Sequence, residues 1–347
     1  MLVTPATLAG LLLPAPLDTA MFHAAHASLA VLCDALAGLA ALAPSSLWHL
    51  PRPVAFALAA SCVGVAWAFA PRGWPLRFAA PLTWLPLLAP ALHPAPHGAF
   101  RVTALDIGQG SALVIETARH VLLCDAGPGP ESTHAGERIV APYLLAAGVR
   151  GLDTLVVSSD SDHAGGAPAV LRALAVRQVL ASLPADDPLW AGARARRPDA
   201  ALRCVADQRW MWDGVEFRVL WPDPGLLSGK PNHQSCVLRV TSAAGRAALF
   251  MADIEADVER ALIAPHHGSR TSSTEPVLDS VEPRVAMFQV GYRNHFRHPN
   301  PTVFARYALR AIELSRSDED SAARIDIGEE IVLARFRQTH ARYWMGR

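Results

Sequence analysis

Charged residues are distributed unevenly along this chain, and that distribution limits what it can fold into. Only five of its 62 Lys, Arg, Asp and Glu residues lie in residues 1–99, and the other 57 lie in residues 100–347. A soluble domain is about a quarter charged, so the composition of residues 1–99 excludes a plain soluble enzyme, and its apolar character excludes a disordered tail. We therefore predict membrane-associated helices over residues 1–99 and a globular domain over residues 100–347 that is soluble on its own.

Residues 53–71 are the best candidate for a membrane-spanning helix. This uncharged stretch would extend about 28 Å as a helix, close to the ~30 Å thickness of the hydrocarbon core, although a buried helix of a soluble protein is the alternative. Residues 78–92 are apolar but contain three prolines, so we expect a kinked or re-entrant segment. Residues 19–43 are predicted to form a helix with His23 and His26 on one face. We favour an interfacial helix there over a proton or metal site.

The pattern changes to short strands and turns after residues 93–97, which are rich in Pro and His and form the predicted linker. Strands are predicted over residues 100–105, 112–116, 120–124, 152–157, 215–220, 236–240, 247–251 and 285–290. Helices are predicted over residues 137–147, 165–175, 253–262 and 302–312. Strands that first follow one another and then alternate with helices indicate an α/β fold with two central sheets and helices outside.

Two counts exclude other classes of protein. The 31 basic and 31 acidic residues balance, so net charge gives no support for a general nucleic-acid binder. The five cysteines are odd in number and lie mostly in apolar runs, so we interpret them as small core residues and not as a disulfide framework or a zinc site. They are Cys33, Cys62, Cys124, Cys204 and Cys236.

Polar residues of the globular domain gather where predicted strands end. Asp160, Asp162 and His163 lie between a buried strand and a helix that follows two glycines. Two carboxylates and an imidazole so close together are suitable ligands for Zn²⁺ or Mn²⁺. The alternative is a helix cap, which would need only one aspartate.

Three other strand-to-loop junctions carry residues of the same kind. Asp125 precedes a glycine turn, Asp253 follows an apolar strand, and His266 and His267 precede Gly268. Each alone is usually a turn or surface residue. Their occurrence together in one domain indicates a shared metal centre.

These residues, in this order, resemble the motifs of the metallo-β-lactamase superfamily. The closer resemblance is to one family, the C-terminal domain of ComEC, the DNA-internalisation channel of natural competence. Residues 105–110, 265–273 and 291–301 resemble three motifs of that family. The likeness covers residues 100–310, and residues 1–99 resemble the last membrane helices of the family's channel domain.

The resemblance implies an αββα sandwich whose proposed activity is hydrolysis of the DNA strand that is not imported. One or two ions, Zn²⁺ or Mn²⁺, would bind at the implied metal and catalytic residues Asp160, Asp162, His163 and Asp253, with His266 or His267. Asp125 and Asp106 would support the ligands from behind. Arg270, Arg293, Arg297 and His298 would hold phosphates, or are solvated loop charges. The implied partners are single-stranded DNA, the plasma (inner) membrane and the remaining channel portion of a competence complex.

The chain departs from the family pattern in four places. Ser158 stands where the family has His, Ser111 where it has Asp, and Ala252 where it has Gly. Twelve residues separate Asp253 from His266, too few for the helix and strand that the family has there. We therefore expect a fragment or degraded copy of the family, and three hypotheses remain: a membrane-anchored phosphodiesterase for single-stranded DNA, a catalytically impaired scaffold, and a generic hydrolase of small esters.

Overall fold

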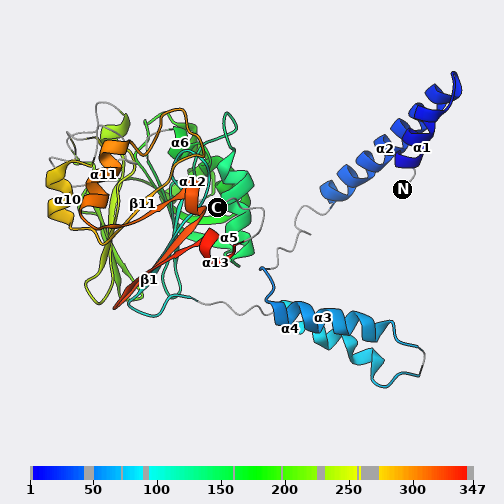
Figure 1. Ribbon diagram of the computed structural model, residues 1–347, viewed down its shortest axis with the longest axis horizontal. Helices are drawn as coiled ribbons and strands as arrows, with labels where there is room; N and C mark the ends of the chain where they lie inside the picture. Colours follow the sequence, from blue (N-terminus) through cyan, green and yellow to red (C-terminus); the bar gives the residue numbers. More distant parts are fainter. Residues whose placement is uncertain are drawn as a thin grey trace. The chain divides into compact units, whose positions relative to one another are not determined.

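The computed structural model describes residues 3–42, 51–71, 73–88, 94–158, 161–196, 198–224, 231–255, 258 and 273–341. The chain divides into two compact units, Met1–His49 and Leu50–Arg347. In Figure 1 the first unit is dark blue, and the second runs from light blue to red.

The first unit contains two helices, α1 (Val3–Leu12) and α2 (Leu17–Leu42). Among the described residues, α2 is the one helix that is long and apolar enough to cross a membrane: Leu17–Leu39 is 23 residues long with a mean hydropathy of 1.4. Large apolar side chains along it are exposed, among them Val31 and Leu36. The helix predicted over residues 19–43 is confirmed, but its length and composition are those of a membrane span.

The segment predicted to span the membrane, residues 53–71, is shorter than expected. Its helix α3 covers Ala55–Ala68, about 21 Å, because it ends before Pro71 and the residue preceding a proline avoids the helical region. The 3₁₀-helix η1 (Arg77–Trp84) and the short α4 (Leu85–Leu88) follow. The helix predicted over residues 53–71 is present but shorter than predicted, and the predicted break in residues 78–92 agrees with the 3₁₀ geometry.

The globular part is built on an eight-stranded sheet in the order β14-β13-β1-β2-β3-β4-β5-β6. Its half from β3 to β6 is parallel and the other half is antiparallel. The strands are β1 (Phe100–Ala104), β2 (Leu113–Glu116), β3 (Val121–Cys124), β4 (Gly151–Val157), β5 (Ala175–Ala181), β6 (Ala201–Arg203), β13 (Ala323–Ile327) and β14 (Ile331–Arg335).

A second, antiparallel sheet packs on the first. Its order is β10-β9-β8-β7, with β7 (Arg209–Trp212), β8 (Val215–Trp221), β9 (Val237–Thr241) and β10 (Ala247–Phe250). A parallel pair, β11 (Val285–Phe288) and β12 (Glu313–Arg316), forms a third small sheet. A shared core joins the two large sheets, with Ile115 and Leu122 of one packed with Phe217 and Leu238 of the other.

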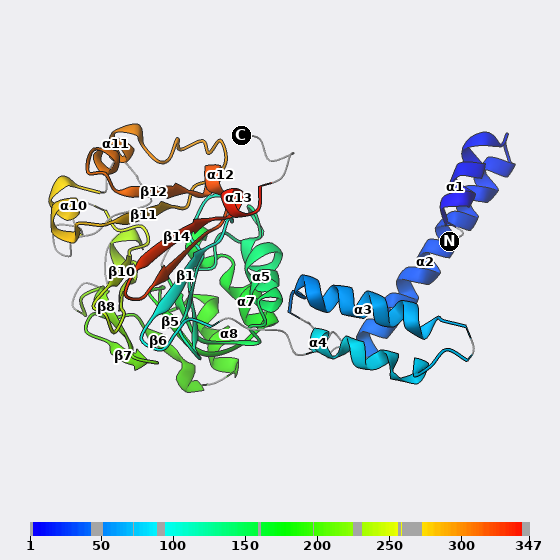
Figure 2. The same cartoon turned by 60° about the horizontal axis from the view of Figure 1, so that its bottom comes forward.

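Helices cover the outer faces of these sheets. On the main sheet lie η2 (Gly136–Val140, a π-helix), α5 (Ala141–Ala146), α7 (Ala167–Ala173) and α8 (Pro188–Arg196), whose buried side chains form one core with β3, β4 and β5. Figure 2 shows α5, α7 and α8 on one side of β1, β5 and β6, with β7, β8 and β10 on the other. On the third sheet lie α10 (Glu275–Val281) and α11 (Pro301–Leu309). The predicted αββα arrangement is confirmed.

Shorter elements complete the chain: α6 (Ser161–Ala164), η3 (Pro198–Ala200), η4 (Pro231–Gln234), α12 (Ser317–Asp320) and α13 (Phe336–Thr339). The predicted helix over residues 253–262 and the shortened connection before His266 lie largely outside the described residues. A cavity of about 640 Å³ lies between β10 and the β11 side of the fold, lined mainly by apolar residues such as Phe250, Val285 and Met287.

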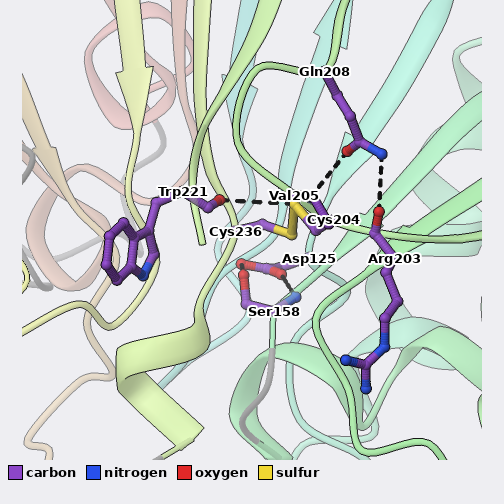
Figure 3. Close-up of a disulfide and its surroundings, with 8 residues drawn as sticks. All are labelled: Asp125, Ser158, Arg203, Cys204, Val205, Gln208, Trp221 and Cys236. Carbon is purple, nitrogen blue, oxygen red and sulfur yellow. Dashed lines mark hydrogen bonds between the residues drawn. A yellow bond between two sulfur atoms is a disulfide. The ribbon is translucent and has the colours of Figure 1, made fainter. Parts of the chain in front are cut away.

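One interpretation of the cysteines was wrong. Cys204, just after β6, and Cys236, just before β9, form a disulfide with their Cα atoms 6.0 Å apart (Figure 3). The sequence did not indicate this pair because the two residues are 32 positions apart and meet only when the two sheets stack. Cys124 is a buried thiol, as predicted, whereas Cys33 and Cys62 are exposed.

Asp213 ties the second sheet to the first. With Gly214 it forms the two-residue turn between β7 and β8, and both residues have positive φ (51° and 82°), as expected for an Asp-Gly hairpin. Its buried carboxylate accepts hydrogen bonds of 2.8 Å from Thr117 Oγ1 and from the backbone and side chain of Arg119, and lies 3.0 Å from His120 Nδ1. All three partners belong to the β2–β3 turn.

These contacts also change the pKa of this carboxyl group. Burial by itself would raise the pKa of Asp213, but the hydrogen bonds from His120, Thr117 and Arg119 outweigh burial and hold the pKa well below its usual range. A folded-state pKa below the unfolded value means that the charged form stabilises the fold. This stabilisation is present above the unfolded pKa of about 3.9 and is lost as pH falls towards the folded value.

We predict that Asp213→Ala lowers the free energy of unfolding by about 1.5–3 kcal/mol at pH 7, the range for hydrogen bonds to a charged group. Asp213→Asn should lose less, because asparagine also tolerates positive φ and keeps an acceptor oxygen. Urea denaturation checks both variants, and the difference between wild type and Asp213→Asn should narrow as pH falls from about 5 to 2. Equal stability of all three proteins at pH 7 would contradict the role of this carboxylate.

Candidate metal centre

A histidine with 0% exposure, His163, lies where two parallel strands of the main sheet end. Asp125 directly follows β3 and Ser158 directly follows β4, and these strands are neighbours with Cys124 opposite Val156. The carboxyl ends of adjacent parallel strands form one edge, where sites of α/β proteins commonly lie. His163 reaches this edge from α6, the single turn that follows β4.

Asp125 fixes the position of the His163 ring. Its carboxylate accepts a 2.7 Å hydrogen bond from His163 Nδ1 through Oδ2 and a 2.8 Å bond from the Ser158 amide through Oδ1. The Asp125 amide donates to Val156 O at 2.8 Å, so the residue is held at both its backbone and its side chain. A carboxylate behind an imidazole sets the tautomer and orientation of the ring, as is usual for metal-binding histidines.

The other ring nitrogen faces a second carboxylate from the opposite sheet. His163 Nε2 lies 3.1 Å from Asp253 Oδ1, and Asp253 follows β10 by three residues. Possible ligand atoms of Asp162, His163 and Asp253 all lie within 4.8 Å of one another. Two carboxylates and one imidazole at this spacing fit a divalent cation such as Zn²⁺ or Mn²⁺.

The two carboxylates determine the protonation state of His163. Burial by itself lowers the pKa of this imidazole, but the charges of Asp125 and Asp253 and their hydrogen bonds outweigh burial, so the pKa lies well above its ordinary value of 6.5. The two carboxylates therefore favour the protonated imidazolium, with its Nδ1 proton bonded to Asp125 and its Nε2 proton facing Asp253 at ion-pair distance. A cation that binds Nε2 must displace that proton.

Two glycines allow the backbone segments around His163 to approach one another. A Cβ at Gly110, whose φ is +113°, would lie 2.2 Å from Asp162 O, and a Cβ at Gly166 would lie 2.0 Å from Ala126 O. Both distances are far below van der Waals contact, so only glycine fits. The Gly-Gln-Gly segment seen in the sequence thus supports the turn that carries Asp162 and His163.

The structure brings together some of the predicted site residues. Asp162, His163 and Asp253 converge, and Asp125 is hydrogen-bonded to His163. Four predicted residues lie outside the described part of the chain: Asp160, His266, His267 and Arg270.

The remaining predicted residues lie on other segments. Asp106 accepts a 3.0 Å hydrogen bond from Ser321 Oγ, which connects it to the turn before β13. Arg293, Arg297 and His298 lie in the loop between β11 and α11. In the sequence, Ser158 is notable only because it stands where the family has a metal-binding histidine. The hydrogen bond from its backbone amide to the Asp125 carboxylate is visible only in the structure (Figure 3).

Comparison with known proteins gives two kinds of match. The family model described as the metallo-beta-lactamase superfamily matches residues 105–291. Among solved structures, the metallo-beta-lactamase fold protein YhfI from Bacillus subtilis covers 66% of this chain and 99% of its own, with 11% identity and a TM-score of 0.41.

Curated relatives include three bacterial proteins. Competence protein ComA of Neisseria gonorrhoeae is 34% identical over 79% of this chain, Recombination protein 2 of Haemophilus influenzae is 30% identical over 60%, and ComE operon protein 3 of Bacillus subtilis is 26% identical over 66%. The chain spans 39%, 26% and 33% of their lengths, respectively. The predicted resemblance to the C-terminal part of ComEC-type competence proteins is confirmed.

The raised pKa of His163 predicts that metal binding becomes tighter as pH rises. One displaced proton corresponds to about a tenfold change in affinity per pH unit below the raised pKa. Calorimetric titration of Zn²⁺ or Mn²⁺ in buffers of different ionisation enthalpy should show about one proton released per ion. Asp125→Asn removes a charge that raises the pKa and should weaken this pH dependence. Affinity that does not change between pH 6 and 8 would contradict the assignment.

In the metal-free protein the raised pKa of His163 makes the fold less stable as pH rises, whereas metal affinity increases as pH rises. Because the folded pKa of His163 is raised, the stabilisation from its two ion pairs is complete below the unfolded pKa of about 6.5 and is lost as pH rises through the folded value. The pH titration of metal binding therefore needs parallel thermal melts without metal, which separate weaker folding from tighter binding.

We further predict that Ser158→His increases metal affinity. Its side chain would start from the strand end beside Asp125 and His163, where serine is a poor ligand. The gain should be at least about 10-fold, since even groups behind the ligands change affinity about 10–100-fold. Ser158→Ala is the matched control, because it keeps the hydrogen bond from the backbone amide of residue 158 to Asp125. Unchanged weak binding in Ser158→His, with a thermal melt like that of the control, would show that serine does not limit the site.

Proposed function

This chain belongs to the metallo-beta-lactamase superfamily, and from that membership we propose that it acts in DNA uptake as a membrane-associated, metal-dependent phosphodiesterase for single-stranded DNA. The observation that carries the proposal is the convergence of Asp162, His163 and Asp253 at one strand edge, with Asp125 behind the ring. A divalent cation there would supply Lewis acidity, polarising a phosphoryl oxygen and lowering the pKa of a nearby water.

The residues of the chain itself would prepare the centre for this chemistry. Asp125 holds the His163 ring in one orientation by accepting a hydrogen bond from Nδ1, which leaves Nε2 to face the ligand space. Asp162 and Asp253 bring two negative charges to balance a divalent cation. His163 and Asp125 are fully buried, so water has no access from behind. Arg293 and Arg297 would supply positive charge for phosphates.

The choice of DNA as substrate rests on the relatives. Proteins named for competence and recombination are 26–34% identical to this chain, and natural competence imports DNA as a single strand. Helix α2 has the length and composition of a membrane span, which is consistent with a plasma-membrane location. The partner we propose is the channel portion of a DNA-uptake complex.

A second candidate function is that of a catalytically impaired scaffold in the same complex. Ser158 stands where an imidazole would add a ligand, and in the structure His163 Nε2 is bonded to Asp253. Both features weaken metal binding relative to a site with more histidines. The scaffold needs only the fold and the membrane association.

Cleavage of end-labelled oligonucleotides distinguishes the two functions. We expect the full chain in detergent, loaded with Mn²⁺ or Zn²⁺, to cleave a single strand faster than a duplex, and EDTA to abolish the reaction. Asp162→Asn and His163→Gln should each reduce the rate at least about 100-fold, because each removes a direct ligand. A metal-saturated wild type that cleaves neither substrate would exclude the enzyme and leave the scaffold.

Membrane association has its own test. We expect the full chain to remain with membranes after alkaline carbonate extraction, and the piece 100–347 to be soluble without detergent. The physical reason is the charge distribution, with only five charged residues in 1–99. Full release of the chain by carbonate, or insolubility of the isolated piece, would contradict the proposed division.

A further inference from the structure

The loop between β11 and α11 carries two large aromatic side chains in solvent. Residues 291–298, here called the aromatic loop, include Tyr292 at 73% exposure and Phe296 at 56%. Neither residue takes part in the metal centre. Burying either ring would gain free energy from the hydrophobic effect, so their exposure in a well-held loop requires an explanation.

The aromatic loop is held close to the metal centre by a short series of hydrogen bonds. Gln289, two residues before the loop, accepts from Ser111 Oγ at 3.0 Å and donates to Leu105 O at 3.0 Å. Gly291 N donates to Gln109 Oε1 at 3.4 Å. The same 105–111 segment contacts the site, since Ser111 N donates to Asp162 O at 3.4 Å.

Hydrogen bonds fix the conformation of the loop backbone, so the positions from which the two aromatic side chains extend are also fixed. Asn294 closes it from inside: its Nδ2 donates to Gly291 O at 3.0 Å and to His298 O at 2.8 Å, and its Oδ1 accepts from His298 N at 2.8 Å. Arg293 and Arg297 both have positive φ (52° and 55°). Such backbone is unfavourable by about 1–2 kcal/mol per residue outside glycine, and it persists only where the surrounding structure holds it in place.

The charged residues of the loop itself have a single sign. Residues 291–298 contain two arginines and no aspartate or glutamate. The Arg293 guanidinium lies 5.2 Å from the Tyr292 ring centroid. On the other side Phe296 lies beside His295 and His298, with ring centroids 3.7 Å and 5.8 Å away. Aromatic faces alternating with cations form the pattern that binds the bases and phosphates of single-stranded nucleic acid.

We propose that the aromatic loop is a base-stacking platform for single-stranded DNA, with Tyr292 and Phe296 stacking on bases and Arg293 and Arg297 on the neighbouring phosphates. The proposal rests on the proposed function and specifies how that substrate is held. A single strand is required because bases of a duplex already stack on one another and do not offer their faces. Binding here places the strand beside the centre formed by Asp162, His163 and Asp253.

The test measures binding in the absence of metal. A fluorescently labelled single strand is titrated with the full chain in detergent and EDTA, and anisotropy reports the dissociation constant. Tyr292→Ala and Phe296→Ala should each weaken binding about 5- to 150-fold, the range for loss of one stacked base. Tyr292→Phe, which keeps a ring, should bind like wild type. Leu309→Ala removes an 86% exposed apolar side chain at the end of α11 and is the matched control with no expected effect.

Salt and substrate form supply further readouts. Arg293→Gln should reduce the slope of log affinity against log salt by about 0.7, the value for one phosphate contact on a single strand. A duplex of the same length should bind wild type more weakly than the single strand does. Its affinity should be the same for the aromatic variants as for wild type. Thermal melts of all variants check that folding is intact.

The outcomes separate this proposal from the proposed function. Tight binding in EDTA that the aromatic variants weaken, without cleavage when metal is added, would support the platform and exclude the enzyme. Aromatic variants that bind the single strand like wild type, or a duplex bound as tightly as the single strand, would overturn the platform whatever the cleavage result. If the aromatic variants lost binding to anionic lipid vesicles but bound DNA like wild type, the loop would be assigned to the membrane surface. That result would also overturn the platform.

Discussion

The ion-paired chain Asp125–His163–Asp253 is the interaction on which the site depends. Asp125 extends from β3 of the main sheet and Asp253 from the loop after β10 of the second sheet, and the buried imidazole bonds to both. A buried histidine between two carboxylates is stable only if it is charged, because a neutral ring would leave one carboxylate without a donor. His163 and Asp253, together with Asp162, could hold a divalent cation once the Nε2 proton leaves, while Asp125 stays bonded to Nδ1. A cation that bound there would take the place of the proton on Nε2.

Two further contacts join the sheets. The disulfide Cys204–Cys236 links the end of β6 to the start of β9, and Figure 3 shows it beside Asp125 and Ser158. Asp213 links the β7–β8 turn to the β2–β3 turn. Each tie connects residues that hydrophobic contact alone would not fix, since apolar packing between sheets is not directional. Together they restrict how the sheets can slide, which keeps Asp253 within reach of His163.

Close backbone contacts hold the turns around the site in place, and hydrogen bonds connect these turns to the exposed aromatic loop. Gly110 and Gly166 permit contacts that no other residue would allow, and these contacts hold the α6 turn. The 105–111 segment then connects this turn to Gln289 and to the aromatic loop. Ala252, with a φ of 43°, takes a backbone conformation that suits glycine at the step before Asp253. A site assembled from turns of both sheets needs such unusual backbone because strands alone present side chains only on their faces.

The sequence by itself determined the elements whose pattern is local. Apolar runs such as residues 152–157 identified buried strands, and the positions of Asp125, Asp162, His163 and Asp253 after strands predicted a common centre, because strand ends in a layered fold meet at one edge. It also determined the apolar character of residues 1–99. The tertiary structure decided what depends on contacts between residues far apart in the chain: the pairing of Cys204 with Cys236, the anchoring role of Asp213, and the amide of Ser158 as a support for Asp125. It also placed the helix of membrane-spanning length at α2, because helix ends depend on turns and capping as well as on composition. A local pattern reports how each residue is buried, but which distant residues meet is fixed only when the sheets stack.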